Sequence, residues 1–162
     1  MNENLPQVEI YTDGSCLNNP GKGGYAAILI YGSHRKEIYG GYRYTTNNRM
    51  EIMAVIQGLK ALKRPCRVNL YTDSQYVVNA MTKGWVEKWQ KNNWRRSAHE
   101  KAKNVDLWQE LLRVSKPHHV NYIWVRGHAG HPENERCDYL AHQAAMGSNL
   151  AEDEGLEEDI LG

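Results

Sequence analysis

The sequence predicts an α/β fold built on one mixed β-sheet. Three strand-like segments follow one another at residues 8–13, 25–31 and 36–44, and helical and strand patterns then alternate. Strands joined by turns pair antiparallel, whereas a strand–helix–strand crossover gives parallel neighbours. A chain of 162 residues also has the usual length of one domain with one core. We therefore expect a single sheet with an antiparallel part and a parallel part, flanked by helices.

The predicted elements can be placed one by one. A turn rich in Gly, Pro and Asn separates the first two strands, and Gly32-Ser33 separates the second from the third. Helices are then expected at residues 48–62, 74–82, 105–114 and 132–145, and strands at 67–72 and 119–125. Pro65 stands where the first helix should already have ended. Pro132 begins the last helix at the position that best tolerates proline.

The composition excludes several classes of protein. Hydrophobic residues make up 41% and charged residues 24%, as in a globular rather than a disordered or fibrous protein. The 3 cysteines have no Cys-x-x-Cys spacing, which indicates neither a disulfide framework nor a zinc cluster. No apolar run approaches ~20 residues, and residues 1–7 lack the pattern of an export signal. We expect a cytoplasmic protein, with residues 1–7 as a short N-terminal extension.

Charge is distributed unevenly, although the net charge is only +1. Between residues 83 and 103 seven basic side chains stand against two acidic ones, and Trp85, Trp89 and Trp94 are interleaved with them. A polyanion responds to such a local field rather than to the net charge. Alternatively, Trp85 and Trp89 are four residues apart and form a core stripe, while the bases form a solvated helix face.

The last residues differ in composition from the rest of the chain. After Ala151 the sequence contains six acidic side chains and no basic one. Charge of one sign and low hydrophobicity favour a solvated segment. We expect residues 147–162 to form an acidic flexible tail outside the domain at 8–146.

Two of the predicted strands end with the same three residues, Tyr-Thr-Asp. Asp13 and Asp73 therefore have the same phase, and both lie at the carboxyl ends of the strands if these strands are parallel neighbours. At ~5 Å and an effective dielectric of ~20, the two charges would repel each other by about 3 kcal/mol. A cation would offset this repulsion. Hard oxygen ligands without His or Cys nearby in sequence favour magnesium or manganese.

Each acidic residue also has a local structural explanation. Asp13 precedes a glycine and could form a turn, and Asp73 could cap the helix that follows it. Glu51 could complete a capping box with Asn48, and Asp138 could be a surface residue near the start of the last helix. The interpretation as a metal site depends on these acids acting together.

Longer motifs occur along most of the chain. They are IYTDGSCLNNPGKGGYAAIL, TTNNRMEIMA, YTDSQYV, KNVDLW and VRGHAGHPENERCDYLA. In this order and spacing they resemble the bacterial type 1 ribonuclease H family from about residue 8 to residue 146, and several agreeing motifs are more specific than one. The resemblance implies a ribonuclease H-like fold with a five-stranded mixed sheet in the order 3-2-1-4-5. It also implies an endonuclease that hydrolyses the RNA strand of RNA·DNA hybrids.

The resemblance further implies roles for individual residues. The metal-binding carboxylates would be those of Asp13, Glu51, Asp73 and Asp138, with His128 as the catalytic histidine. Two Mg²⁺ ions, with Mn²⁺ as a possible substitute, would support in-line hydrolysis that leaves 5′-phosphate and 3′-hydroxyl ends. Histidine titrates near neutral pH, which suits proton transfer or help with product release. The alternative for His128 is an ordinary histidine of a surface loop.

Substrate contacts follow from the same resemblance. Residues 83–104 match the basic handle of the family, whose bases would neutralise phosphates of the DNA strand while Trp85 or Trp89 packs on a sugar. Thr46 and Asn104 would form a phosphate pocket for that strand. Amide side chains near the metals would contact 2′-hydroxyls and base edges. These amides belong to Asn19, Asn47, Asn48 and Gln75. Turn chemistry is the alternative for Asn19 and for the Asn47-Asn48 pair.

Three other functions fit parts of this pattern. Integrases and resolvases are metal-dependent enzymes on the same fold, but the NNRME, YTDSQ and GHAGHPENE motifs count against them. A non-catalytic hybrid-binding module would not need four acids. A phosphatase of small molecules would not need the basic tryptophan segment. We therefore expect a monomeric enzyme that acts on an RNA·DNA hybrid.

Overall fold

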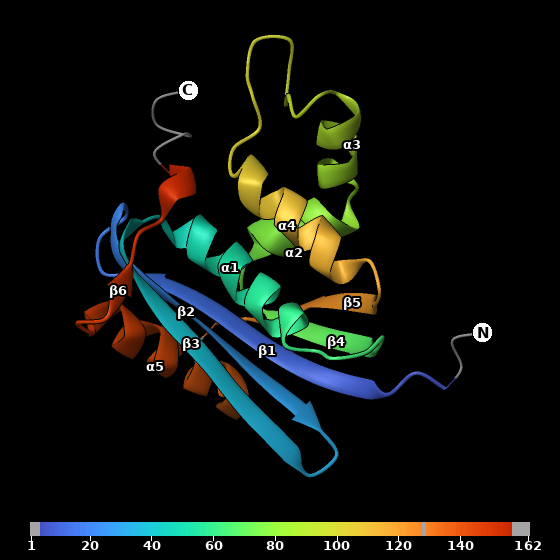
Figure 1. Cartoon of the computed structure of the whole chain (residues 1–162), viewed down its shortest axis with the longest axis vertical. Coiled ribbons are helices and arrows are strands. Elements are labelled where there is room, and N and C mark those ends of the chain that lie inside the picture. The colour runs from blue at the N-terminus through green and yellow to red at the C-terminus, as the bar shows by residue number, and fades with distance from the viewer. Residues whose placement is uncertain (1–3, 128, 157–162) are drawn as a thin grey trace.

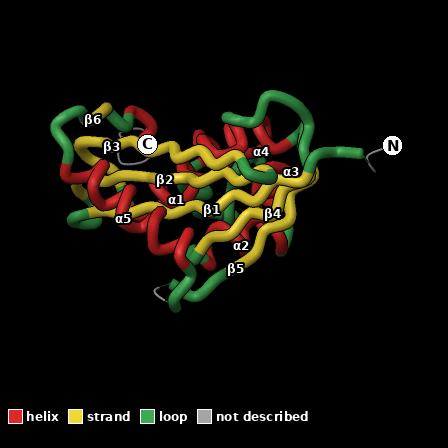
Figure 2. Tube along the Cα trace, turned by 90° about the horizontal axis from the view of Figure 1, so that it is seen from below, coloured by secondary structure: helices red, strands yellow, loops and turns green. Residues whose placement is uncertain are grey.

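The computed structural model describes residues 4–127 and 129–156 (Figure 1). In chain order its elements are β1 (Gln7–Cys16), β2 (Gly21–Tyr31), β3 (His34–Thr45), α1 (Asn47–Lys60), β4 (Arg67–Thr72), α2 (Gln75–Thr82), α3 (Trp85–Lys91), α4 (Val105–Ser115), β5 (His119–Trp124), α5 (Pro132–Met146) and β6 (Leu150–Ala151). The strands form one six-stranded sheet in the order β5-β4-β1-β2-β3-β6, which Figure 2 shows as a single layer.

The sheet is mixed, as the sequence predicts. β1 pairs antiparallel with β2, and β2 with β3, whereas β1 with β4 and β4 with β5 are parallel. The order 3-2-1-4-5 of the first five strands is confirmed. The predicted number of five strands is wrong, because the short β6 adds a parallel edge strand next to β3. A strand of two residues has too little alternation to be recognised in a sequence.

Helices cover both faces of the sheet (Figure 1). On one face α1 packs against β1 and β2, and the main core joins residues such as Ile10, Ile56 and Trp108. On the other face α5 packs against β1, β2 and β3, where Ala26 and Ala141 are fully buried. Within the described residues, no helix combines the length and apolar character that crossing a membrane requires.

The helix starts depend on local capping. Helix α1 begins one residue earlier than predicted because Thr46 is its N-cap, and the hydroxyl of Thr46 accepts a 3.2 Å hydrogen bond from the backbone N–H of Arg49. Ser74 caps α2 in the same way through the backbone N–H of Val77. The short helix α3 was not predicted; it follows Gly84, whose φ of 74° favours glycine.

The prediction of a flexible acidic tail is wrong for residues 150–156. β6 extends the sheet, the Asp153 carboxylate binds the guanidinium of Arg49, and Leu156 is buried. The prediction rested on the acidic composition of this segment and on the assumption that acidic side chains are solvated. A buried cation elsewhere in the chain can hold such a side chain inside the protein.

Candidate active site

The two strands that end in Tyr-Thr-Asp are parallel neighbours. Tyr11 pairs with Tyr71 in the β1–β4 register, so Asp13 and Asp73 both lie two residues beyond this pair. Glu51 reaches the same place from the first turns of α1. One carboxylate oxygen from each of Asp13, Glu51 and Asp73 lies within 4.8 Å of the others. We call these three residues the carboxylate cluster.

Gly14 allows α1 to approach β1 closely enough to form this cluster. Its backbone N–H donates to Asp13 Oδ1 at 2.9 Å and to Glu51 Oε1 at 2.7 Å. A Cβ at this position would lie 2.4 Å from the backbone nitrogen of Glu51, so no larger residue fits without moving the helix. Glycine thus both orients two of the carboxylates and permits their approach.

The local explanations for three of the acids do not hold. Asp13 lies within β1 rather than in a turn. Thr46 rather than Asn48 caps α1, and the Glu51 carboxylate bonds to the β1 backbone instead of completing a capping box. Ser74 rather than Asp73 caps α2.

The carboxylate cluster is electrostatically unfavourable without an added cation. Burial, together with the charges of Asp73 and Asp138, raises the pKa of Asp13 to about 9. Burial and the charges of Asp13 and Asp73 likewise raise the pKa of Glu51 well above its usual range. Within the described residues, Asp73 Oδ1 is buried and has no hydrogen-bond partner. These features fit a divalent cation with a preference for hard oxygen ligands, such as Mg²⁺ or Mn²⁺.

Helix α5 contributes the fourth predicted acid. Asp138 lies close enough to Asp13 for its charge to contribute to the raised pKa of Asp13. Pro132 occupies the start of α5 as predicted, and Glu133 lies in its first turn. The carboxylates of β1, α1, α5 and the end of β4 therefore converge. His128 falls outside the described residues.

The polar residues predicted to bind substrate lie around the start of α1. Asn19 Oδ1 accepts a 3.0 Å hydrogen bond from the backbone N–H of Asn47, a loop contact of the kind that turn chemistry predicts. Asn48 is exposed on the first turn of the helix. Asn104 is buried at the start of α4, and its Nδ2 donates to the hydroxyl of Tyr76. These residues come from three separate segments of the chain.

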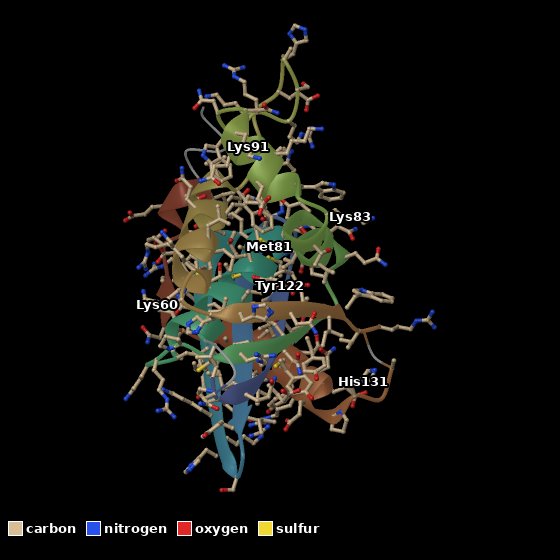
Figure 3. The ribbon with its side chains drawn as sticks, turned by 90° about the vertical axis from the view of Figure 1, so that its right-hand side faces the viewer. Lys60, Met81, Lys83, Lys91, Tyr122 and His131 are labelled. Carbon is tan, nitrogen blue, oxygen red and sulfur yellow. The ribbon has the colours of Figure 1, made fainter. Side chains whose placement is uncertain are left out.

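Gln75 and the basic segment lie on the α2–α3 side. Gln75 is exposed at the first position of α2, two residues after Asp73. Residues 83–104 form α3 and a loop that projects beyond the helices in Figure 1, and Figure 3 labels Lys83 and Lys91 on this part. We call this segment the handle.

The tryptophans of the handle divide between two roles. Trp89 packs against the core, with its ring centroid 6.3 Å from that of Trp108. Trp85 packs against Trp89 with tilted rings, whose centroids are 6.4 Å apart, and is 37% exposed. The core-stripe interpretation therefore describes Trp89, whereas Trp85 presents an accessible aromatic face beside the bases.

Sequence reasoning missed one part of this region. Arg49, two residues before Glu51, is fully buried and bonds to Asp106, Asp153 and Asn104. One signal was available in the sequence. Arg49 stands three positions before Ile52, so it lies on the core face of the predicted helix, where a charged residue needs a buried partner.

A mixed sheet whose parallel strands bring acidic residues together, with helices on both faces, defines an α/β protein with a carboxylate site suited to divalent cations. A family model described as RNase H matches residues 6–146. The ribonuclease H of Syntrophus aciditrophicus (strain SB) is 59% identical over 149 residues, which cover 92% of this chain and 86% of that protein. The chain therefore belongs to the RNase H family, and it is a ribonuclease H enzyme.

Solved structures agree with this assignment. The crystal structure of LC9-RNase H1, described as a type 1 RNase H with the type 2 active-site motif, matches with a TM-score of 0.81 and 34% identity over 95% of this chain and 81% of that one. LC11-RNase H1 in complex with an RNA/DNA hybrid matches with a TM-score of 0.61 and 18% identity over 86% of this chain and 96% of that one. The second likeness shows the fold alone.

Proposed function

We propose that this enzyme is an endonuclease that hydrolyses the RNA strand of RNA·DNA hybrids, leaving 5′-phosphate and 3′-hydroxyl ends. The observation that carries the proposal is the convergence of three carboxylates, from β1, α1 and the residue after β4, in a chain of the RNase H family. The substrate is supported by the relatives named ribonuclease H, one of which is 59% identical over 92% of this chain.

The carboxylate cluster and Asp138 would hold the divalent cations that this reaction needs. Asp13 is close to the other acids, since the charges of both Asp73 and Asp138 act on it. We propose that two Mg²⁺ ions bind when substrate is present, with Mn²⁺ as a possible substitute. Bound cations would supply Lewis acidity and stabilise the charge that develops on the phosphodiester.

The protein's own groups fix the geometry of the site. The Gly14 N–H holds one oxygen of Asp13 and one of Glu51. The Trp124 indole N–H donates to the Asp73 carbonyl at 3.1 Å and anchors the backbone beside that carboxylate. We propose that His128 moves a proton or assists product release in the loop before α5.

Substrate selectivity would come from two surfaces on either side of the site. The handle would bind the DNA strand, with its bases near phosphates and the exposed Trp85 on a sugar. Thr46 and Asn104 would hold a phosphate of that strand. The amides near the acids would contact the 2′-hydroxyls of the RNA strand. They are those of Asn19, Asn47, Asn48 and Gln75.

A cleavage assay tests this function directly. End-labelled RNA·DNA hybrid, RNA duplex, DNA duplex and single strands are incubated with the protein, in magnesium or in chelator, and Asp13→Asn serves as the control. We expect magnesium-dependent cutting confined to the RNA strand of the hybrid and lost in the variant. Binding without cutting would indicate a hybrid-binding module, and cutting of another substrate would indicate a different nuclease.

The role of His128 is separated from substrate binding by a second assay. His128→Ala should lower the turnover rate strongly while hybrid affinity stays nearly unchanged, because the histidine acts on proton transfer or release rather than on binding. The measurement is steady-state cleavage together with equilibrium binding in calcium or chelator. Equal losses in rate and affinity would contradict the assignment.

A further inference from the structure

Arg49 is the centre of a buried ion cluster next to the candidate active site. Its guanidinium is fully buried and binds two carboxylates at once. Nε and Nη2 donate to Asp153 at 2.7 and 3.0 Å, and Nη1 and Nη2 donate to Asp106 at 2.9 and 2.6 Å. We call Arg49, Asp106 and Asp153 the Arg49 cluster. These paired, nearly parallel contacts restrict the guanidinium to one orientation.

The C-terminal segment closes this cluster. From β6 the chain passes to the beginning of α1, as the red segment in Figure 1 shows. Asp153 also accepts a 2.6 Å hydrogen bond from the hydroxyl of Thr45. At Gly155 an added Cβ would lie 2.6 Å from Arg49 Nη2 and 2.0 Å from Asp106 Oδ2, so a larger residue would displace these side chains. Residues 153–155 thus cover the guanidinium.

The same arginine contacts both residues of the proposed phosphate pocket. Its backbone N–H donates to Thr46 Oγ1, so the Thr46 hydroxyl can still donate its hydrogen to an anion. Its Nη1 donates to Asn104 Oδ1 at 3.4 Å. Because a guanidinium can only donate, the carbonyl end of the Asn104 amide must face Arg49. The NH₂ end, the end that can donate to a phosphate, is turned away and bonds to the Tyr76 hydroxyl at 3.1 Å.

We propose that Asp153 and Asp106 are positioning residues for binding of the DNA strand: they fix Arg49, which orients the Asn104 amide and the Thr46 end of α1 toward a backbone phosphate. The C-terminal segment would thereby form part of the substrate-binding apparatus without touching substrate. This inference rests on the proposed function, since it needs a hybrid substrate whose phosphate occupies the pocket.

The test is Asp153→Asn, with Glu152→Gln as the matched control. Both changes remove one acid from the same segment, but Glu152 makes only a surface pair with Arg43, in which the Glu152 side chain is 67% exposed. Cleavage of the hybrid is measured at a temperature at which circular dichroism shows all variants folded. We expect Asp153→Asn to raise KM about tenfold with kcat within about twofold, because one charge-assisted contact to phosphate is weakened. Glu152→Gln should match the unaltered enzyme.

A double-mutant cycle shows whether the effect passes through Asn104. In an Asn104→Ala background, Asp153→Asn should raise KM by much less than tenfold, because only the effect through Thr46 remains. A rise of the same size in both backgrounds, an unchanged KM in Asp153→Asn alone, or an equal loss of kcat would each overturn the proposal. If the unaltered enzyme fails to cut the hybrid in magnesium, the proposed function itself fails, which is a separate result.

Discussion

Helix α1 contributes one residue to each of two clusters that contain acidic side chains. Glu51 belongs to the carboxylate cluster, and Arg49, two residues earlier, belongs to the Arg49 cluster. In the carboxylate cluster the acids face one another, and the pKa values of Asp13 and Glu51 are raised by burial and by like charge. In the Arg49 cluster the acids face a buried guanidinium, and the contact with Arg49 lowers the pKa of Asp106 against the opposing effect of its burial. The same residue types thus meet opposite electrostatic surroundings on one helix.

This difference in electrostatic surroundings indicates that the carboxylate cluster is a cation-binding site and the Arg49 cluster is a structural one. The Arg49 cluster carries its own cation, and hydrogen bonds occupy both oxygens of Asp106 and of Asp153. The carboxylate cluster has one buried oxygen, on Asp73, without a hydrogen-bond partner in the described part of the chain. Buried like charges repel one another, so binding of a cation lowers the free energy of the site. Removing an acid should therefore have opposite effects on stability in the two clusters.

The largest expected effect is that of Asp13→Asn on activity. The change should reduce hybrid cleavage on the order of 10³-fold, because several kcal/mol of cation-mediated stabilisation are lost. In chelator, however, its melting temperature should be no lower than that of the unaltered protein. Asparagine keeps the oxygen that accepts from Gly14 and removes a group whose ionisation among the crowded acids is costly.

The paired experiment is Asp153→Asn under the same conditions. This variant should melt several degrees lower, because it removes a charge that Arg49 needs. Differential scanning calorimetry in chelator measures both variants. A clear drop in melting temperature for Asp13→Asn would contradict the electrostatic account of the carboxylate cluster.

The second effect concerns the centre of the Arg49 cluster. Arg49→Met should destabilise the protein by about 3 to 5 kcal/mol, because it leaves the buried Asp153 carboxylate without its cation. Arg35→Met is the control, since Arg35 pairs with Glu133 on the surface and should contribute no more than about 1 kcal/mol. Urea denaturation monitored by circular dichroism gives both values. Similar losses for the two variants would mean that burial does not distinguish the pairs.

The sequence contained much of the carboxylate cluster but little of the Arg49 cluster. Identical strand endings put Asp13 and Asp73 together on the condition that the two strands are parallel neighbours, and the family resemblance implied that they are. Glu51 entered through the family resemblance, since its local pattern equally suited a capping box. The position of Asp138 in the site likewise depended on that resemblance.

The partners of Arg49 were not predictable from local pattern. Asp106 and Asp153 lie 57 and 104 residues away in sequence from Arg49. Neither follows a strand that the sequence predicts, and acidic composition placed Asp153 in a solvated tail. Strands and helices give a periodic pattern in the sequence, whereas a pair of single charges far apart in the chain gives none. Strand phase and crossover helices predicted a mixed sheet, whereas the order 3-2-1-4-5 came from the family resemblance, and β6 was not predicted.

The third expected effect is a dependence of stability on pH in chelator. The folded pKa of Asp13 lies above its unfolded value, so the folded state retains a proton that the unfolded state has lost. Stability should therefore fall as pH rises from about 5 to about 9, by at most about 1.4 kcal/mol per pH unit for one proton. Asp13→Asn should show a shallower slope. Denaturant unfolding at a series of pH values measures it, and a rise in stability over this range would contradict the raised pKa.

The smallest expected effect tests how strongly the Arg49 cluster depends on its outer contacts. Thr45→Val keeps the shape of a fully buried side chain and removes the hydroxyl that donates to Asp153 Oδ2 at 2.6 Å. That oxygen keeps its 2.7 Å contact with Arg49 Nε, so the loss should be only about 1 kcal/mol. Urea denaturation beside Arg49→Met provides the comparison. A loss as large as that of Arg49→Met would show that the hydroxyl, rather than the guanidinium, holds Asp153 in the protein.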